Sequence, residues 1–160
     1  MKSGLEWSRQ IASNLTEAQT SAWFAFRAVA DSTHGPGDAL VVRQFGRASE
    51  PYYTTKRFDV FRHYSNAGPP GSTRLETRVG DDQLSAVAFR ASAVSLVVTS
   101  SSHDPRAVDV DLGPGAGRVE VRGRLRARAL PPPPIEYRGQ PLSVTLLSQS
   151  VTTFTLRSPK

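Results

Sequence analysis

Between Arg118 and Ala129 the chain alternates two kinds of side chain without a break. The odd positions carry small or apolar residues such as Val119, Val121 and Leu125, and the even positions carry five arginines and Glu120. A period of two belongs to an extended strand with one face on a core and the other in water. This segment therefore predicts a half-buried β-strand.

Other segments of the second part of the chain have the same strand character. Turn-rich links separate them, and the run Pro131–Pro134 predicts an extended surface link, because proline donates no backbone hydrogen bond. Seven strands at this spacing predict an antiparallel β-sandwich or barrel over residues 72–158. The six strands besides the arginine-rich one are expected at 74–79, 84–90, 94–99, 107–112, 142–147 and 151–156.

Residues 1–67 have a different pattern, in which helix and strand alternate. Ser21–Val29 is nearly continuous apolar sequence, which predicts a strand buried on both faces, as in a parallel sheet. A helix followed directly by such a strand is typical of α/β architecture. The expected elements are a helix over 4–15, the strand over 21–29, a short strand over 40–42 and a helix from Thr54 or Thr55 to Asn66, with a threonine cap.

Composition excludes some functions and leaves others open. The chain has no cysteine, which excludes disulfides and thiolate metal sites, and no apolar run of the roughly 18 residues that a membrane span needs. The net charge is +6 and 17 of the 20 basic residues are arginine, so nucleic acid, anionic membrane or acidic polysaccharide are conceivable partners. The N-terminus has no basic-then-apolar signal pattern, so either the chain stays inside the cell or its beginning is missing.

The arginine-lined face allows two interpretations. Guanidinium groups match the carboxylates or phosphates of an acidic ligand. The segment can instead be the solvated outer face of an edge strand, which its charge protects from edge-to-edge pairing. Aromatic residues do not interleave with these arginines as they do in single-strand nucleic-acid sites, so we favour the solvated face and expect neither nucleic acid nor membrane as partner.

Residues that could carry chemistry are few. His34, His63 and His103 lack the spacing of a metal motif, so no metal or other cofactor is expected. Ser100–Asp104 lacks a nucleophile elbow and is interpreted as a polar turn, and Gly113–Gly117 precedes a strand, which favours a hairpin turn over a phosphate loop.

Glycosidase chemistry needs two carboxyl groups roughly 5 to 5.5 Å apart in retaining enzymes. The candidates are Glu6, Glu17, Asp31 and Asp38. Glu6 and Glu17 fit helix-terminal roles, and the two aspartates fit turn roles in a Gly/Pro/Asp loop. No catalytic residue is therefore assigned.

Several segments together resemble one family. The end of the chain resembles the closing strand of the side domain of glycoside hydrolase family 30, and earlier segments resemble the last helices and the eighth strand of its barrel. The order and spacing agree along nearly the whole chain, although Asp59 and Asn66–Pro69 depart from the pattern. The matching segments are Leu146–Phe154, Thr54–Phe58, Phe61–Ser65, Pro70–Gly71, Leu5–Trp7, Ile11 and Ser21–Phe24.

The resemblance implies a mainly β chain: residues 1–67 are the remnant of a (β/α)8 barrel, helix, strand and helix, and 72–158 an antiparallel β-sandwich side domain. It implies a secreted, retaining enzyme of the β-1,6-galactanase or xylanase type, acting on β-linked galactan or xylan. The acid/base and the nucleophile would precede Met1, so this piece alone is predicted to be inactive.

Two residues carry over as candidate substrate-binding residues. Trp23 and Phe26 would lie at the rim of the sugar site, with packing inside the barrel as the other interpretation for each. Exposed apolar surface such as Trp23 and Phe24 should promote self-association or docking onto the missing barrel portion.

A non-catalytic carbohydrate-binding or scaffold β-sandwich is the alternative function. It would need an exposed aromatic platform, for which Tyr52, Tyr53 and Tyr137 are available, with turn packing as their other role.

Overall fold

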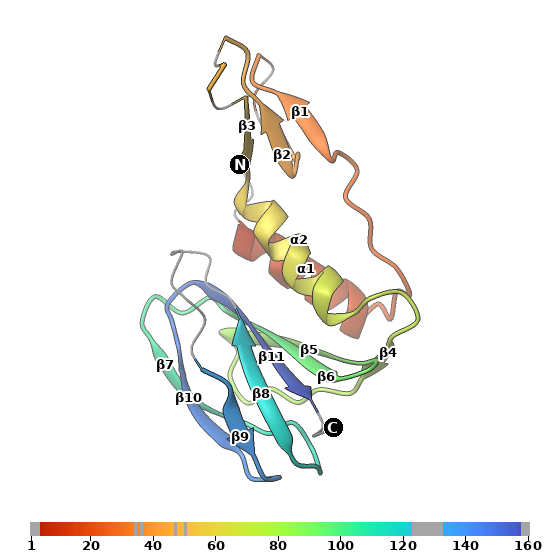
Figure 1. Cartoon of the computed structure of the whole chain (residues 1–160), viewed down its shortest axis with the longest axis vertical. Coiled ribbons are helices and arrows are strands. Elements are labelled where there is room, and N and C mark those ends of the chain that lie inside the picture. Colours follow the sequence, from red (N-terminus) through yellow and green to blue (C-terminus); the bar gives the residue numbers. More distant parts are fainter. Residues whose placement is uncertain are drawn as a thin grey trace. The chain divides into compact units, whose positions relative to one another are not determined.

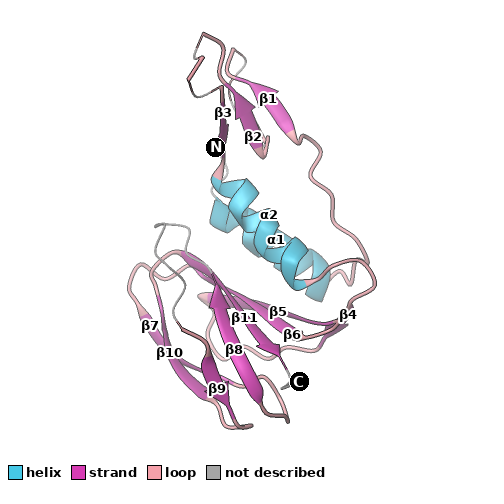
Figure 2. Ribbon diagram, viewed as in Figure 1, coloured by secondary structure: helices cyan, strands magenta, loops and turns pink. Residues whose placement is uncertain are grey.

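The chain divides into two compact units, Met1–Arg62 and His63–Lys160. The computed structural model describes residues 4–33, 35, 37–46, 48–49, 51–122 and 133–157 (Figure 1). Figure 2 shows the mainly β composition, and the helices among the described residues lie in the first half of the chain. The first unit contains α1 (Gly4–Thr16), β1 (Val29–Asp31), β2 (Val41–Arg43), β3 (Tyr52–Thr54) and the start of α2 (Lys56–Ala67).

The two predicted helices are confirmed. Trp7, Ile11 and Ala12 form the buried face of α1, at the helical spacing expected from the sequence. The carbonyl of Thr55 accepts the amides of Phe58 (3.0 Å) and Asp59 (3.4 Å), so Thr55 caps α2 through its backbone. Its hydroxyl group instead donates to the carbonyls of Ala39 and Leu40.

The predicted strand over Ser21–Val29 is wrong in its extent and burial. The strand β1 begins only at Val29, and Phe24 and Phe26 are 85% and 96% exposed. Burial of both faces of a strand needs a layer packed on each face. Phe24 and Phe26 precede β1 in an extended segment that has no such cover within the described residues, so their side chains remain in water.

The sheet of the first unit has the order β1-β2-β3, with β1 parallel and β3 antiparallel to β2. The short strand predicted over 40–42 is confirmed as β2, and β3 was not predicted. Val42 is fully buried on one face of this sheet, while Arg43 and Tyr52 are exposed on the other.

The second unit is a sandwich of two antiparallel sheets. Six strands form one sheet in the order β4-β5-β6-β11-β8-β9, and β10 pairs with β7 in the other. A strand is present at each of the seven predicted places, but β4 ends at Leu75 although a strand was predicted over 74–79, and the strand predicted over 118–129 is described only as far as Arg122. The bounds are β4 Thr73–Leu75, β5 Leu84–Arg90, β6 Val94–Ser100, β7 Arg106–Val110, β8 Gly117–Arg122, β9 Ile135–Tyr137, β10 Leu142–Leu146 and β11 Ser150–Arg157.

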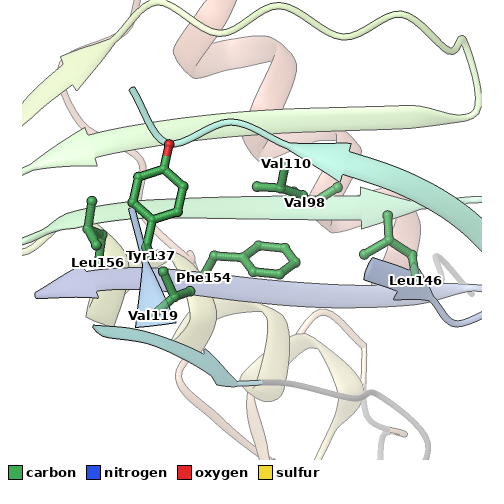
Figure 3. Close-up of a cluster of buried hydrophobic side chains, with 7 residues drawn as sticks. All are labelled: Val98, Val110, Val119, Tyr137, Leu146, Phe154 and Leu156. Carbon is green, nitrogen blue, oxygen red and sulfur yellow. The ribbon is translucent and has the colours of Figure 1, made fainter. Parts of the chain in front are cut away.

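The core of the sandwich is filled by side chains from both sheets (Figure 3). Val110 and Leu146 come from the two-stranded sheet, and Phe154 and Leu156 come from β11 at the middle of the other. In β8 the odd-numbered Val119 is fully buried, as the alternation predicted.

Two details of the sandwich differ from the sequence interpretation. Gly113–Gly117 is not a hairpin turn, because β7 pairs with β10 while β8 pairs with β11 and β9, so this segment crosses between the sheets. The strand β9 was not predicted, and the region of the arginine-rich segment after Arg122 lies outside the described residues.

Tyr137 ties this crossing to the core. Its side chain is 1% exposed, and its hydroxyl group accepts the Leu112 amide (3.2 Å). The same hydroxyl lies 3.0 Å from a carboxylate oxygen of Asp111 and 2.9 Å from the carbonyl of Gly113. Burial first, and then the Asp111 carboxylate, raise the pKa of Tyr137 above its ordinary value.

Replacing Tyr137 by Phe should lower the free energy of unfolding by about 1–3 kcal/mol, because buried polar partners lose their hydrogen bond. The stabilisation from the neutral hydroxyl is complete below about pH 10, the unfolded pKa, and is lost as pH rises through the folded pKa. Urea unfolding at neutral and alkaline pH checks this. The difference in the free energy of unfolding between wild type and Y137F should become smaller at alkaline pH. A difference that does not change with pH would contradict the stabilising role of the neutral Tyr137 hydroxyl group.

Gly117 provides a second test of the sandwich. A Cβ atom placed there would lie 2.1 Å from the carbonyl oxygen of Arg157 on β11, so backbone would have to move. Gly117→Ala should therefore cost about 1–3 kcal/mol of unfolding free energy. Gly80→Ala is the matched control, because nothing lies within 4 Å of its Cβ position. Equal stability of the two variants in urea unfolding would refute the β8–β11 pairing.

Candidate functional site

Trp23 lies in a cluster of rings within the first unit. Its ring meets Trp7 edge to face, with centroids 5.1 Å apart, and Phe61 at a tilt, with centroids 6.0 Å apart. Such geometry stabilises packing beyond the area that it buries. Trp23 thus has a packing role, and its contact with sugar stays a prediction.

Phe26 is placed very differently. It projects into solvent from the extended segment before β1, in which exposed Phe24 and Phe26 alternate with half-buried Trp23 and Ala25. The structure does not bring Phe26 together with Trp23 in one pocket. A ring this exposed is accessible to a ligand or to another strand, and its predicted sugar contact remains untested.

The four candidate carboxylates have structural partners or lie in water. Asp31, at the carboxyl end of β1, accepts bonds from the backbone and hydroxyl groups of Thr33. Asp38 forms an ion pair with Arg57 at 3.3 Å, and Glu17 accepts the Ser13 hydroxyl at 3.1 Å. Glu6 is exposed in the first turn of α1. These contacts fit the turn and helix-terminal roles expected from the sequence.

Arg57 is a residue that the sequence interpretation missed. Its side chain is buried, donates to the Gly37 carbonyl and lies 5.3 Å from the centre of the Trp7 ring. It therefore joins α2 to α1 and to the loop before β2. An arginine inside a charged helical segment gives no sequence signal of burial, so only the structure reveals this role.

The histidines and the serine-rich turn are structural in the described part of the chain. His63 lies 2.7 Å from the Thr153 hydroxyl, and His103 lies 3.3 Å from the Gln149 side chain. The Ser102 hydroxyl accepts the Asp104 amide and the Arg106 guanidinium, which confirms a polar turn. His34 lies outside the described residues, and those that are described contain no metal-binding group of three or more His, Asp or Glu.

The arginine-lined face is a solvated surface in its described part. Glu120 accepts bonds from Arg122 at 2.9 Å and Arg157 at 3.0 Å, and both arginines are exposed. Unlike the expected edge strand, β8 lies between β11 and β9. Arg124, Arg126 and Arg128 lie outside the described residues.

The three tyrosines proposed as an aromatic platform do not lie together in the structure. Tyr137 is buried in the sandwich core, whereas Tyr52 and Tyr53 are exposed on β3, in the first unit. Tyr52 lies directly opposite Arg43 on β2, and the Arg43 guanidinium lies 4.8 Å from the centre of the Phe45 ring. The sequence interpretation singled out neither Arg43 nor Phe45.

The fold has solved counterparts. It superposes on the catalytic domain of GH30 xylanase C from Talaromyces cellulolyticus with a TM-score of 0.78 and 17% identity, over 97% of this chain and 35% of that one. This match is with part of a family 30 xylanase. The chain has that fold.

Two further solved structures of family 30 xylanases have the same fold. A GH30 endoxylanase from Clostridium papyrosolvens C71 matches with a TM-score of 0.73 and 15% identity, over 97% of this chain and 38% of that one. The family 30 subfamily 8 xylanase from Clostridium acetobutylicum matches with a TM-score of 0.67 and 14% identity, over 97% and 38%.

The chain thus spans little more than a third of these family 30 xylanases. No protein-family model and no curated protein sequence matches it. The expected fold class, mainly β with an antiparallel sandwich preceded by helix and strand elements, is confirmed. That the first elements are the remnant of a barrel stays a prediction. Within the described ranges, neither α1 nor α2 has the length and apolar character of a membrane-spanning helix.

Proposed function

We propose that the chain is the C-terminal part of a retaining, polysaccharide-degrading hydrolase of family 30. In this account residues 1–67 complete a (β/α)8 barrel and residues 72–158 form its side domain. The observation that carries the proposal is the fold match over 97% of the chain with three family 30 xylanases. Sharing a fold does not fix an activity, which depends on the catalytic residues.

The acids of this chain argue for catalytic carboxylates elsewhere in the protein. A retaining enzyme needs an ionised nucleophile and an acid/base facing one glycosidic bond. Asp31 is held by Thr33, Asp38 by Arg57 and Glu17 by Ser13, which are contacts of turns and helix ends. We propose that both catalytic residues belong to the remaining barrel portion.

The open side of the small sheet supports a missing neighbour. The outer edge of β1 has no strand beside it in the described part of the chain, and Phe24, Phe26 and Val29 are exposed there. Exposed strand edges with apolar side chains promote pairing with another chain. We propose that the remaining barrel portion covers this edge, and that the isolated chain self-associates through it.

The proposed substrate is a β-linked xylan or galactan. Three solved structures that share the fold are named as xylanases, and another similar structure is an endo-β1,6-glucanase, matched at a TM-score of 0.58. Trp23 and Phe26 are the proposed substrate-binding residues at the rim of the sugar site. A secreted location follows from the proposed family alone.

The alternative of a non-catalytic carbohydrate-binding sandwich receives less support. Of its three candidate rings, Tyr137 fills the core, and Tyr52 and Tyr53 lie outside the sandwich. The sandwich therefore lacks the exposed tyrosine platform that this function would use.

The purified 160-residue chain should release no reducing sugar from β-1,4-xylan or β-1,6-galactan. A longer gene product with an in-frame barrel upstream should hydrolyse one of them, because it would supply both carboxylates. Reducing-end assays on the two polysaccharides measure this. Turnover by the short chain that disappears in Glu6→Gln or Asp31→Asn would overturn the proposal.

A further inference from the structure

Two exposed rings lie beside a guanidinium group, one on β3 and the other in the turn after β2. Tyr52 is 56% exposed and Phe45 is 54% exposed, although large aromatic side chains are usually covered. Arg43 lies between them, opposite Tyr52 across the strands and over the Phe45 ring. We call Arg43, Phe45 and Tyr52 the ring platform.

The ring platform is held in place by backbone hydrogen bonds. The Arg43 carbonyl accepts the Ser32 amide at 2.9 Å, and the Ser32 hydroxyl accepts the Phe45 amide at 3.3 Å. The Gln44 amide donates to the Pro51 carbonyl at 2.7 Å, which closes the link between β2 and β3. These bonds fix the backbone that carries the three side chains, so the backbone needs little ordering when a ligand binds.

The opposite face of the sheet has a different role. Val42, between Val41 and Arg43, is fully buried, and Tyr53 points to the same side because successive strand residues alternate. The exposure of Phe45 and Tyr52 therefore does not come from general disorder of the sheet. The exposure of Tyr52 follows from the register that places it opposite Arg43, and Phe45 is exposed in the turn after β2.

The chemistry of the ring platform fits a sugar better than an apolar protein partner. Pyranose rings combine apolar C–H faces, which stack on aromatic rings, with hydroxyl groups, whose oxygens accept from the five donors of arginine. A stable protein interface buries about 800 Å² on each partner, whereas the ring platform consists of three side chains.

The location of the ring platform agrees with this ligand. Arg43 ends β2, and β1 runs parallel to β2, so both carboxyl ends lie at the same edge of the sheet. Barrel enzymes build their substrate sites at the carboxyl ends of their parallel strands. Phe45 follows that end directly.

We infer that the ring platform binds a β-linked polysaccharide chain, with Tyr52 and Phe45 stacking on sugar rings and Arg43 donating to hydroxyl oxygens. This inference deepens the proposed function and rests on it for the class of sugar. It adds a binding surface distinct from Trp23 and Phe26.

Affinity electrophoresis of the 160-residue chain in gels containing β-1,4-xylan or β-1,6-galactan tests this. One of the two should retard the wild type, and Tyr52→Ala or Phe45→Ala should weaken the apparent Kd about tenfold. Tyr53→Ala is the matched control, since it removes the neighbouring ring from the opposite face. Circular dichroism of each variant verifies that it folds.

No retardation of the wild type, or an equal loss in a folded Tyr53→Ala variant, would overturn the inference. A dimer that depends on Tyr52 and forms without sugar binding would also overturn the inference, because the ring platform would then mediate pairing of two copies of the chain. Failure of the proposed function is distinguishable, because turnover by the short chain would refute that proposal while Tyr52-dependent retardation persisted.

Discussion

The double pairing of β11 is the interaction on which the sandwich depends. This strand bonds β6 along seven residue pairs, Ser150–Ser100 to Leu156–Val94, and bonds β8 on its other edge. Its alternate residues serve two faces: Phe154 and Leu156 fill the core, and Thr153 meets His63 from α2. One strand at the end of the chain thus unites segments that lie far apart in sequence.

The first unit is organised differently, around a sheet in which β1 pairs with β2 alone as far as the structure describes the chain. Contacts of the Trp7 ring with Trp23 and Arg57 hold α1, α2 and the segment before β1 together. Tyr52 on β3 and Val29 on β1 are exposed to solvent. A small sheet with exposed rings is a poor self-contained core but a suitable surface for a strand and a ligand. The exposed side of this sheet is therefore where we propose both the contact with the remaining barrel portion and the contact with sugar.

Local patterns in the sequence predicted most of the sandwich and both helices. The period of two predicted the described part of β8, whose Val119 meets the core. The apolar run bounded by turns predicted β5, in which the consecutive residues Val87, Ala88 and Phe89 are all buried. Prediction failed where tertiary context decides. The apolar run Ser21–Val29 suggested burial that only neighbouring strands could provide, and the link Gly113–Gly117 could not show which sheet its flanking strands join. Arg57 and the ring platform depend on packing and register, which composition does not reveal.

The central claim is that the nucleophile of the proposed hydrolase is absent from this chain. A mechanism-based inactivator of retaining glycosidases, which forms a covalent ester with the nucleophilic carboxylate, tests it directly when the intact mass of the 160-residue chain is measured. The account predicts an unchanged mass after incubation with xylose- and galactose-configured inactivators. A stoichiometric mass increase that maps to Asp31, Asp38, Glu6 or Glu17 would contradict it.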